Sequence, residues 1–246
     1  MIRRPPSRAL VLGALAVAQA IYGRRPARSP ASTRAMLLAI LATSTFEGTQ
    51  ARGARCGALP AAVAGGSGFV AELMGVRTGV PFGRYAYSGR LGPRIGGVPL
   101  LAAGAWAAMA RPAWVTAGWV TEAPLPRVMT AAGALTAWDV FLDPRLAREG
   151  YWRWERPGRY EGIPASNFLG WWLTASAAFA LVARLDPFGS GTEDDAALAL
   201  YVWTWVGETF ANGVLWRQQR AAVAGGVAMG LFATPALARR RAGQRR

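Results

Sequence analysis

The sequence predicts an all-α, polytopic integral membrane protein: one bundle of seven or eight transmembrane helices. Three observations predict this class. Hydrophobic residues make up 52% of the 246-residue chain. Charges gather in short segments between long runs of Ala, Leu, Val, Gly and Trp, and a spanning helix needs roughly 20 mostly apolar residues. Spans of this length leave no room for a separate soluble domain, so we expect a single membrane domain over residues 1–246, with a basic N-terminus (1–8) and a basic tail (239–246).

The first three predicted spans cover residues 9–22, 33–46 and 57–75. The first follows a basic segment, and together they resemble the charged and apolar regions of a secretory signal. Because further spans follow, we expect this first helix to remain uncleaved. The second span leads into Glu47 and the third contains Glu72 near its end, so both place an acid where a lipid-facing side chain would otherwise stand.

Five more spans follow from the same alternation of apolar runs and charged connections. They cover residues 100–120, 128–142, 167–185, 196–216 and 221–238. Residues 76–99, rich in Gly and Pro, connect the third span to the fourth, and the aromatic and charged residues 149–164 connect the fifth to the sixth. With eight spans these two connections share one face of the membrane. Residues 186–195 are typical of a solvated turn.

The basic residues are all arginine, and the chain has a formal net charge of +15 with no histidine. The arginines are dispersed over the connections and both termini, which argues against nucleic-acid binding. The dispersed pattern favours contacts with the anionic headgroups of a lipid bilayer, here the cell membrane, with both termini in the cytoplasm. A single cysteine, Cys56, and the lack of histidine exclude disulfide frameworks, Cys/His zinc sites and triads that need imidazole.

Acidic residues inside or beside the predicted spans are the candidate catalytic groups, because an acid at the centre of a spanning helix costs about 2.5–3.5 kcal/mol. They are Glu47, Glu72, Asp139, Asp143 and Glu208. For each, the alternative is a structural role: pairing with Arg77, Arg84, Arg145 or Arg217, or capping a helix near the interface.

Asp139 and Asp143 form a pair, since residues four apart share one helix face. Two carboxyl groups close together in a low dielectric cannot both ionise cheaply, so one would keep its proton near neutral pH. A protonated carboxyl in an apolar site is what acid attack on an alkene requires. The alternative for Asp143 is that the dipeptide with Pro144 simply ends the helix.

Aromatic side chains crowd both long connections. In the first we single out Phe82, Arg84, Tyr85 and Tyr87, and in the second Trp152 and Trp154. Such residues anchor membrane proteins at the bilayer interface, and their π faces also stabilise cations. The sequence leaves both interpretations open.

Two blocks of the chain resemble the membrane carotenoid biosynthesis protein family, which includes carotenoid hydratases and bisanhydrobacterioruberin hydratases. The first block is ELMGVRTGVPFGRYAY at residues 72–87 with LGPRIGGVPL at residues 91–100. The second combines AWDVFLDP at residues 137–144, EGYWRWE at residues 149–155 and GIPASNFLGW at residues 162–171. The resemblance covers roughly residues 47–216.

This resemblance implies an enzyme that adds water across the terminal double bond of an acyclic carotenoid, giving a tertiary alcohol. From the chemistry of the residues, Asp139 or Asp143 is the expected proton donor, with Glu72 or Glu208 acting on the water. Phe82, Arg84, Tyr85, Tyr87, Trp152 and Trp154 are expected to contact the substrate, and Asn167 to bind the water. The reaction needs no cofactor, and the sequence carries no motif for a nucleotide, flavin or metal. Other carotenoid enzymes are expected partners.

Three alternatives remain open at the level of sequence. The same initial protonation could lead to ring closure, which would make the protein a carotenoid cyclase. Carboxyl groups in spans are equally typical of a proton-coupled carrier of apolar or lipid-linked molecules. A non-catalytic scaffold that gathers carotenoid enzymes is the third.

Overall fold

The computed structural model describes residues 7–25, 28–185 and 191–243. Parts of the basic N-terminus (1–6), the turn (186–190) and the tail (244–246) lie outside the described residues. The helices are α1 Arg8–Arg24, α2 Pro30–Thr78, α3 Leu100–Val120, α4 Pro124–Arg148, α5 Ala165–Leu185, α6 Asp195–Phe210 and α7 Gln219–Gly243. The strands are β1 Tyr85–Tyr87, β2 Arg94–Ile95, β3 Val98–Pro99 and β4 Trp152–Trp154, and short helical turns cover η1 Gly89–Leu91, η2 Thr192–Asp194 and η3 Ala211–Leu215. The all-α class is confirmed.

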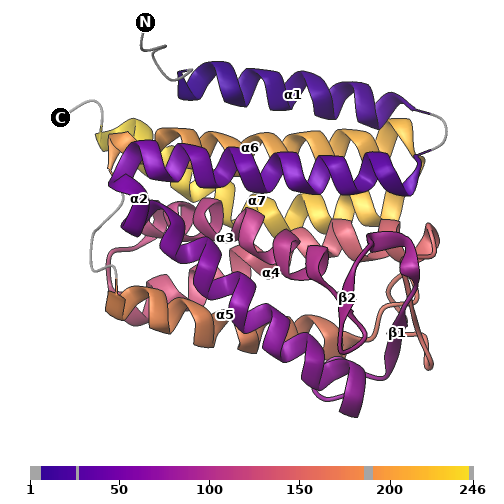
Figure 1. Cartoon of the computed structure of the whole chain (residues 1–246). Helices are drawn as coiled ribbons and strands as arrows, with labels where there is room; N and C mark the ends of the chain where they lie inside the picture. The colour runs from indigo at the N-terminus through magenta and orange to yellow at the C-terminus, as the bar shows by residue number, and fades with distance from the viewer. Residues whose placement is uncertain (1–6, 26–27, 186–190, 244–246) are drawn as a thin grey trace, which may run out of the picture.

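Helix α2 is bent, and its two arms correspond to the second and third predicted spans (Figure 1). The arms meet at Gly53, whose φ of +79° is not helical and lies in the region that favours glycine. Close to the bend, Gly48 and Gly57 touch: a Cβ on Gly57 would lie 2.1 Å from the Gly48 backbone. Only glycine permits this approach, so the arms cross tightly where the chain reverses.

Helices α3 and α4 form the centre of the bundle. The side chains of α3 are buried on every face from Ala105 to Gly118, which is the pattern of a helix surrounded by others. Helix α4 packs against α3, α5 and α7. It continues through Pro144 to Arg148, so the alternative that Asp143 and Pro144 end this helix is wrong.

Apolar side chains cover much of the outside of the bundle, as expected for a protein in a bilayer. Exposed leucines and valines include Val17 on α1, Val70 on α2, Leu173 on α5, Val206 on α6 and Val227 on α7. By length and composition, α2, α5 and α7 could each cross a membrane. The number of spans beyond these stays a prediction.

The two long connections meet at one end of the bundle, as expected for connections that share one face of the membrane. Strands β1 and β4 pair antiparallel, with Tyr85 opposite Trp154 and Tyr87 opposite Trp152. Side chains alternate along a strand, so these four aromatics share one face of the pair. Ala86 and Arg153 on the other face are exposed.

Close packing of α7 on α4 gives a test of the fold. A Cβ on Gly225 would lie 2.6 Å from the ring of Phe141, which is fully buried. We expect Gly225→Ala to destabilise the protein by about 1–3 kcal/mol through overpacking, measured as a lower Tm in detergent. A Cβ on Gly66, exposed on α2, meets nothing within 4 Å, so Gly66→Ala is the matched control. Equal Tm values for the two variants would contradict this packing.

Candidate active site

A cavity beneath the β1–β4 pair collects three of the five candidate acids. Glu72 from α2 and Asp139 and Asp143 from α4 line it, together with Asn167 from α5. We call it the carboxylate cavity. Its volume is about 40 Å³, which has room for a few water molecules because one needs roughly 10–15 Å³.

Seven aromatic side chains form about half of the remaining wall, and leucines and alanines form the rest. Tyr85, Tyr87, Trp152 and Trp154 come from the paired strands, and Trp106, Trp138 and Trp171 come from α3, α4 and α5. The rings contact one another in series: Tyr85 lies 6.1 Å from Trp154 and Tyr87 lies 5.7 Å from Trp152, centroid to centroid. Trp106 and Trp171 are 4.2 Å apart. The acids therefore face π surfaces on several sides.

Glu72 accepts hydrogen bonds from both tyrosines of β1. The Tyr85 hydroxyl donates to its Oε2, and the Tyr87 hydroxyl donates to its Oε1 at 2.6 Å. Burial, followed by the charge of Glu72, raises the pKa of both tyrosines above the ordinary value of 10.0. Both phenols thus stay protonated and remain donors to this carboxylate.

Asp139 and Asp143 differ in their hydrogen bonds although they lie one turn apart. Asn167 Nδ2 donates to Asp143 Oδ2 at 2.6 Å. Asp139 Oδ2 is buried and has no hydrogen-bond partner within the described part of the chain, and the same holds for Trp138 Nε1 and Trp154 Nε1. All three residues line the carboxylate cavity, and a buried polar atom without a partner is a candidate to bind a small polar molecule such as water.

No arginine is among the residues that line the carboxylate cavity in the described ranges. Glu72, Asp139 and Asp143 are at most 6% exposed. Several negative charges without a counter-ion in a buried cavity repel one another strongly. The arrangement therefore holds at least one of the three carboxyl groups in its protonated, neutral form, next to others that can accept a proton.

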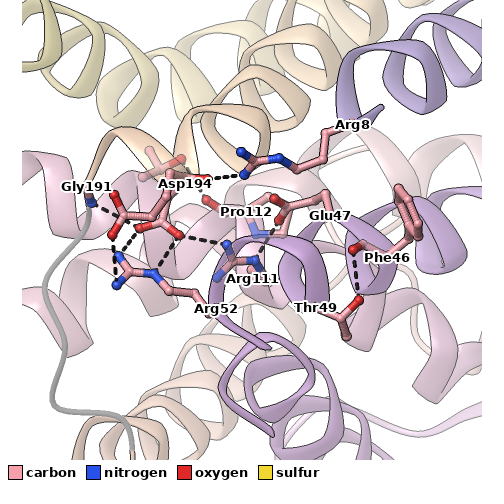
Figure 2. Close-up of polar contacts among 11 residues, drawn as sticks. Arg8, Phe46, Glu47, Thr49, Arg52, Arg111, Pro112, Gly191 and Asp194 are labelled. Carbon is pink, nitrogen blue, oxygen red and sulfur yellow. Dashed lines mark hydrogen bonds and ion pairs between the residues drawn. The ribbon is translucent and has the colours of Figure 1, made fainter. Parts of the chain in front are cut away.

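Glu47 lies elsewhere, in a buried ion-pair cluster near the bend of α2 (Figure 2). Arg111 Nε donates to Glu47 Oε1 at 2.6 Å, and Arg111 Nη2 donates to Asp194 Oδ1 at 2.7 Å. Asp194 also accepts from Arg52 Nε at 3.0 Å and from the Gly191 N–H at 3.0 Å. The cluster joins α2, α3 and the start of α6. Glu47 is paired with an arginine, but its partner Arg111 is not one of the four arginines expected from the sequence.

Asp194 corrects the description of residues 186–195 as a solvated turn. Its side chain is 2% exposed. Burial alone would raise its pKa, but the hydrogen bonds from Arg52, Gly191 and Arg111 outweigh burial and lower it. The turn thus carries a buried anion that the sequence pattern did not distinguish from its exposed neighbours.

Glu208 also lies outside the carboxylate cavity and faces an arginine. Its Oε1 is 3.8 Å from Nη1 of Arg145, and Asn212 Nδ2 donates to its Oε2 at 3.1 Å. Arg145 was one of the arginines proposed as a structural partner, so for Glu208 that alternative is confirmed.

Phe82 and Arg84 do not line the carboxylate cavity. Phe82 is fully buried, and its ring centroid lies 4.1 Å from that of Trp171. Arg84 is exposed, and its backbone carbonyl accepts from the Glu155 N–H at 2.9 Å.

The sequence reasoning missed Trp106, Trp138 and Trp171. Among the described residues, no three His, Cys, Asp or Glu side chains are arranged to hold a metal ion.

Comparisons with known proteins point in one direction. The sequence profile of the carotenoid biosynthesis protein family matches residues 10–233. A bisanhydrobacterioruberin hydratase of Haloarcula japonica is 32% identical over 115 residues, which cover 45% of this chain and 39% of that relative. The chain therefore matches well under half of this curated relative's length. No solved structure matches the chain.

The buried cluster gives a test that separates Glu47 from the carboxylate cavity. Arg111→Met leaves two buried anions, Glu47 and Asp194, without this partner, so we expect a loss of about 3–5 kcal/mol of stability. The measurement is the Tm in detergent, with Arg220→Met, on an exposed residue, as control. Adding Glu47→Gln to Arg111→Met should restore part of the loss. A Tm equal to that of Arg220→Met would contradict the assignment.

Proposed function

The chain belongs to the carotenoid biosynthesis protein family, and we propose that it is an enzyme that hydrates the terminal double bond of an acyclic carotenoid. The hydratase name of the Haloarcula japonica relative supports this reaction type. The observation that carries the proposal is the carboxylate cavity, where three acids without an arginine face a wall of aromatic rings.

Asp139 is the proton donor in this proposal. Its Oδ2 has no hydrogen-bond partner in the described part of the chain, and an isolated buried carboxyl group is far more stable neutral than charged. The Asp139 O–H transfers its proton to the less substituted carbon of the terminal double bond. The π electron pair forms the new C–H bond, Asp139 becomes a carboxylate, and a tertiary cation develops on the neighbouring carbon.

The aromatic wall stabilises that cation. Ring faces attract positive charge, by about 0.5–2 kcal/mol or more where water is excluded. Tyr85, Tyr87, Trp152 and Trp154 all line the cavity, and pairing of their strands holds the rings in a fixed arrangement. The carboxylates in the same cavity add an electrostatic attraction that grows as the cation forms.

Glu72 and Asp143 handle the water. A water oxygen attacks the tertiary cation, and one of its protons passes to a carboxylate; Glu72 is the assigned acceptor because two phenols orient it. Asn167 orients Asp143, which passes the proton gained by Glu72 back to Asp139. The net change is the addition of one water molecule, so protons and electrons balance without a cofactor.

The membrane setting suits such a substrate. A carotenoid is insoluble in water and partitions into the bilayer, and α2, α5 and α7 are long and apolar enough to cross one. We propose a multi-pass protein of the cell membrane, working beside other enzymes of carotenoid synthesis that supply its substrate. Water reaches the site from the membrane face where β1 and β4 lie.

Removal of the proton donor tests the proposal directly. We expect Asp139→Asn to lower the rate of hydration by about 10²–10⁴-fold, the usual contribution of general acid catalysis. The assay is lycopene in a producing bacterial host, with the pigment mass followed by liquid chromatography and mass spectrometry. Glu122→Gln, which neutralises an exposed acid between α3 and α4, is the control and should match the wild type.

Each other outcome points to a different function. A new pigment of unchanged mass would mean ring closure, and the protein would then be a cyclase. A wild type that leaves both lycopene and an elongated acyclic carotenoid unchanged would refute the hydratase proposal. A wild-type rate in Asp139→Asn would refute the assignment of the donor.

A further inference from the structure

The proposed reaction uses only the end of a long molecule, so the rest of the polyene needs its own binding site. A second cavity adjoins the first. Its volume is about 220 Å³, and residues of α1, α2, α4, α6 and η3 line it. Leu37 and Trp138 line both cavities, so these two side chains form the partition between them.

A third hollow lies next to the second cavity, farther along α1. It has a volume of about 850 Å³ and lies between α1 and α6, and Trp203 of α6 lines both this hollow and the second cavity. Figure 1 shows α1 at the edge of the bundle, running beside α6. Eleven of the 17 residues of α1, spread from Arg8 to Arg24, line one or the other. At 1.5 Å per residue the path is about 25 Å long, close to the bilayer core of roughly 30 Å.

The chemistry of this path suits an unsaturated hydrocarbon. Its wall is mostly apolar and includes the rings of Trp203, Phe210 and Trp216. Some of the polar groups along it have partners in the protein. Glu208 faces Arg145, and Trp203 Nε1 donates to Gln19 Oε1 at 2.6 Å. A polyene stacks on aromatic rings and needs no hydrogen bond.

We propose that the polyene of the carotenoid substrate lies along α1, through the hollow beside α6 and the second cavity, and that its end passes between Leu37 and Trp138 to reach the carboxylates. This inference rests on the proposed function for the identity of the ligand. It assigns Leu37 and Trp138 as the constriction that admits the end group of the carotenoid, and α6 as the wall that positions the polyene.

Gly207 on α6 offers a clean way to block the path. It lines the second cavity, and a Cβ added there meets no atom within 4 Å. Gly207→Phe would therefore fill the cavity without a backbone clash, and Gly207 does not line the carboxylate cavity. Gly66→Phe on α2 is the matched control, since Gly66 is exposed, has equal space and lines none of the three cavities described.

The experiment measures two quantities on full-length protein purified from lycopene-producing cells: the lycopene retained per protein and the fraction hydrated. We expect Gly207→Phe to retain at least fivefold less lycopene than the wild type and Gly66→Phe. Gly13→Phe, in the hollow beside α1 where an added Cβ also meets nothing, is the second variant and should show the same loss.

The outcomes separate this inference from the proposed reaction. Equal retention in Gly207→Phe, Gly13→Phe and Gly66→Phe would overturn the polyene path, whatever the hydration. The expected retention pattern without any hydrated product would support the path and refute the hydration of lycopene. If Gly207→Phe fails to fold, Gly13→Phe alone decides. Retention of phospholipid in place of lycopene by the wild type would overturn the assignment of the occupant.

Discussion

The candidate site depends on the antiparallel pairing of β1 with β4. This short pair ties the connection after α2 to the connection after α4, two segments that are far apart in the chain. It sets Tyr85 and Tyr87 over Glu72 and brings Trp152 and Trp154 beside them. Because side chains alternate along a strand, the Tyr-Ala-Tyr and Trp-Arg-Trp triplets present all four rings to the same side. Without the pair, α2 and α4 would still hold three acids, but those acids would lack their aromatic cover and Glu72 would lack its two donors.

Arginine divides the buried acids of the bundle into two kinds. Glu47 and Asp194 share Arg111, and Glu208 faces Arg145, so these anions are neutralised and stabilise the arrangement of helices. Glu72, Asp139 and Asp143 have no arginine in the wall of their cavity among the described residues. An unpaired charge in a buried space is costly. A fold that retains three carboxyl groups in such a space therefore favours protonated carboxyl groups, which can donate a proton. The same electrostatic rule therefore accounts for a structural cluster at the bend of α2 and a chemically active one under the strands.

Much of this arrangement could be predicted from the sequence, and the failures have physical causes. The cost of placing an acid inside a membrane identified Glu72, Asp139 and Asp143 as candidates. The segments Tyr85–Tyr87 and Trp152–Trp154 were identified by their aromatic side chains. Trp106, Trp138 and Trp171 were missed because a tryptophan inside an apolar span carries no sign of which way it faces. Arg111 could have been found, since an arginine in the middle of residues 100–120 has the same insertion cost as an acid. The burial of Asp194 could not, because only the folded bundle brings Arg52 of α2 and Arg111 of α3 to it.

The source of the added atoms tests the central claim most directly. The claim is that a protein carboxyl group protonates the terminal double bond and that water captures the resulting cation. Purified protein would be supplied with lycopene in water enriched in oxygen-18, and separately in deuterium oxide, and the product examined by mass spectrometry. The account predicts one oxygen-18 on the tertiary carbon and one deuterium on its neighbour for each end that reacts. A product whose oxygen comes from elsewhere, or that gains no deuterium at that carbon, would contradict it.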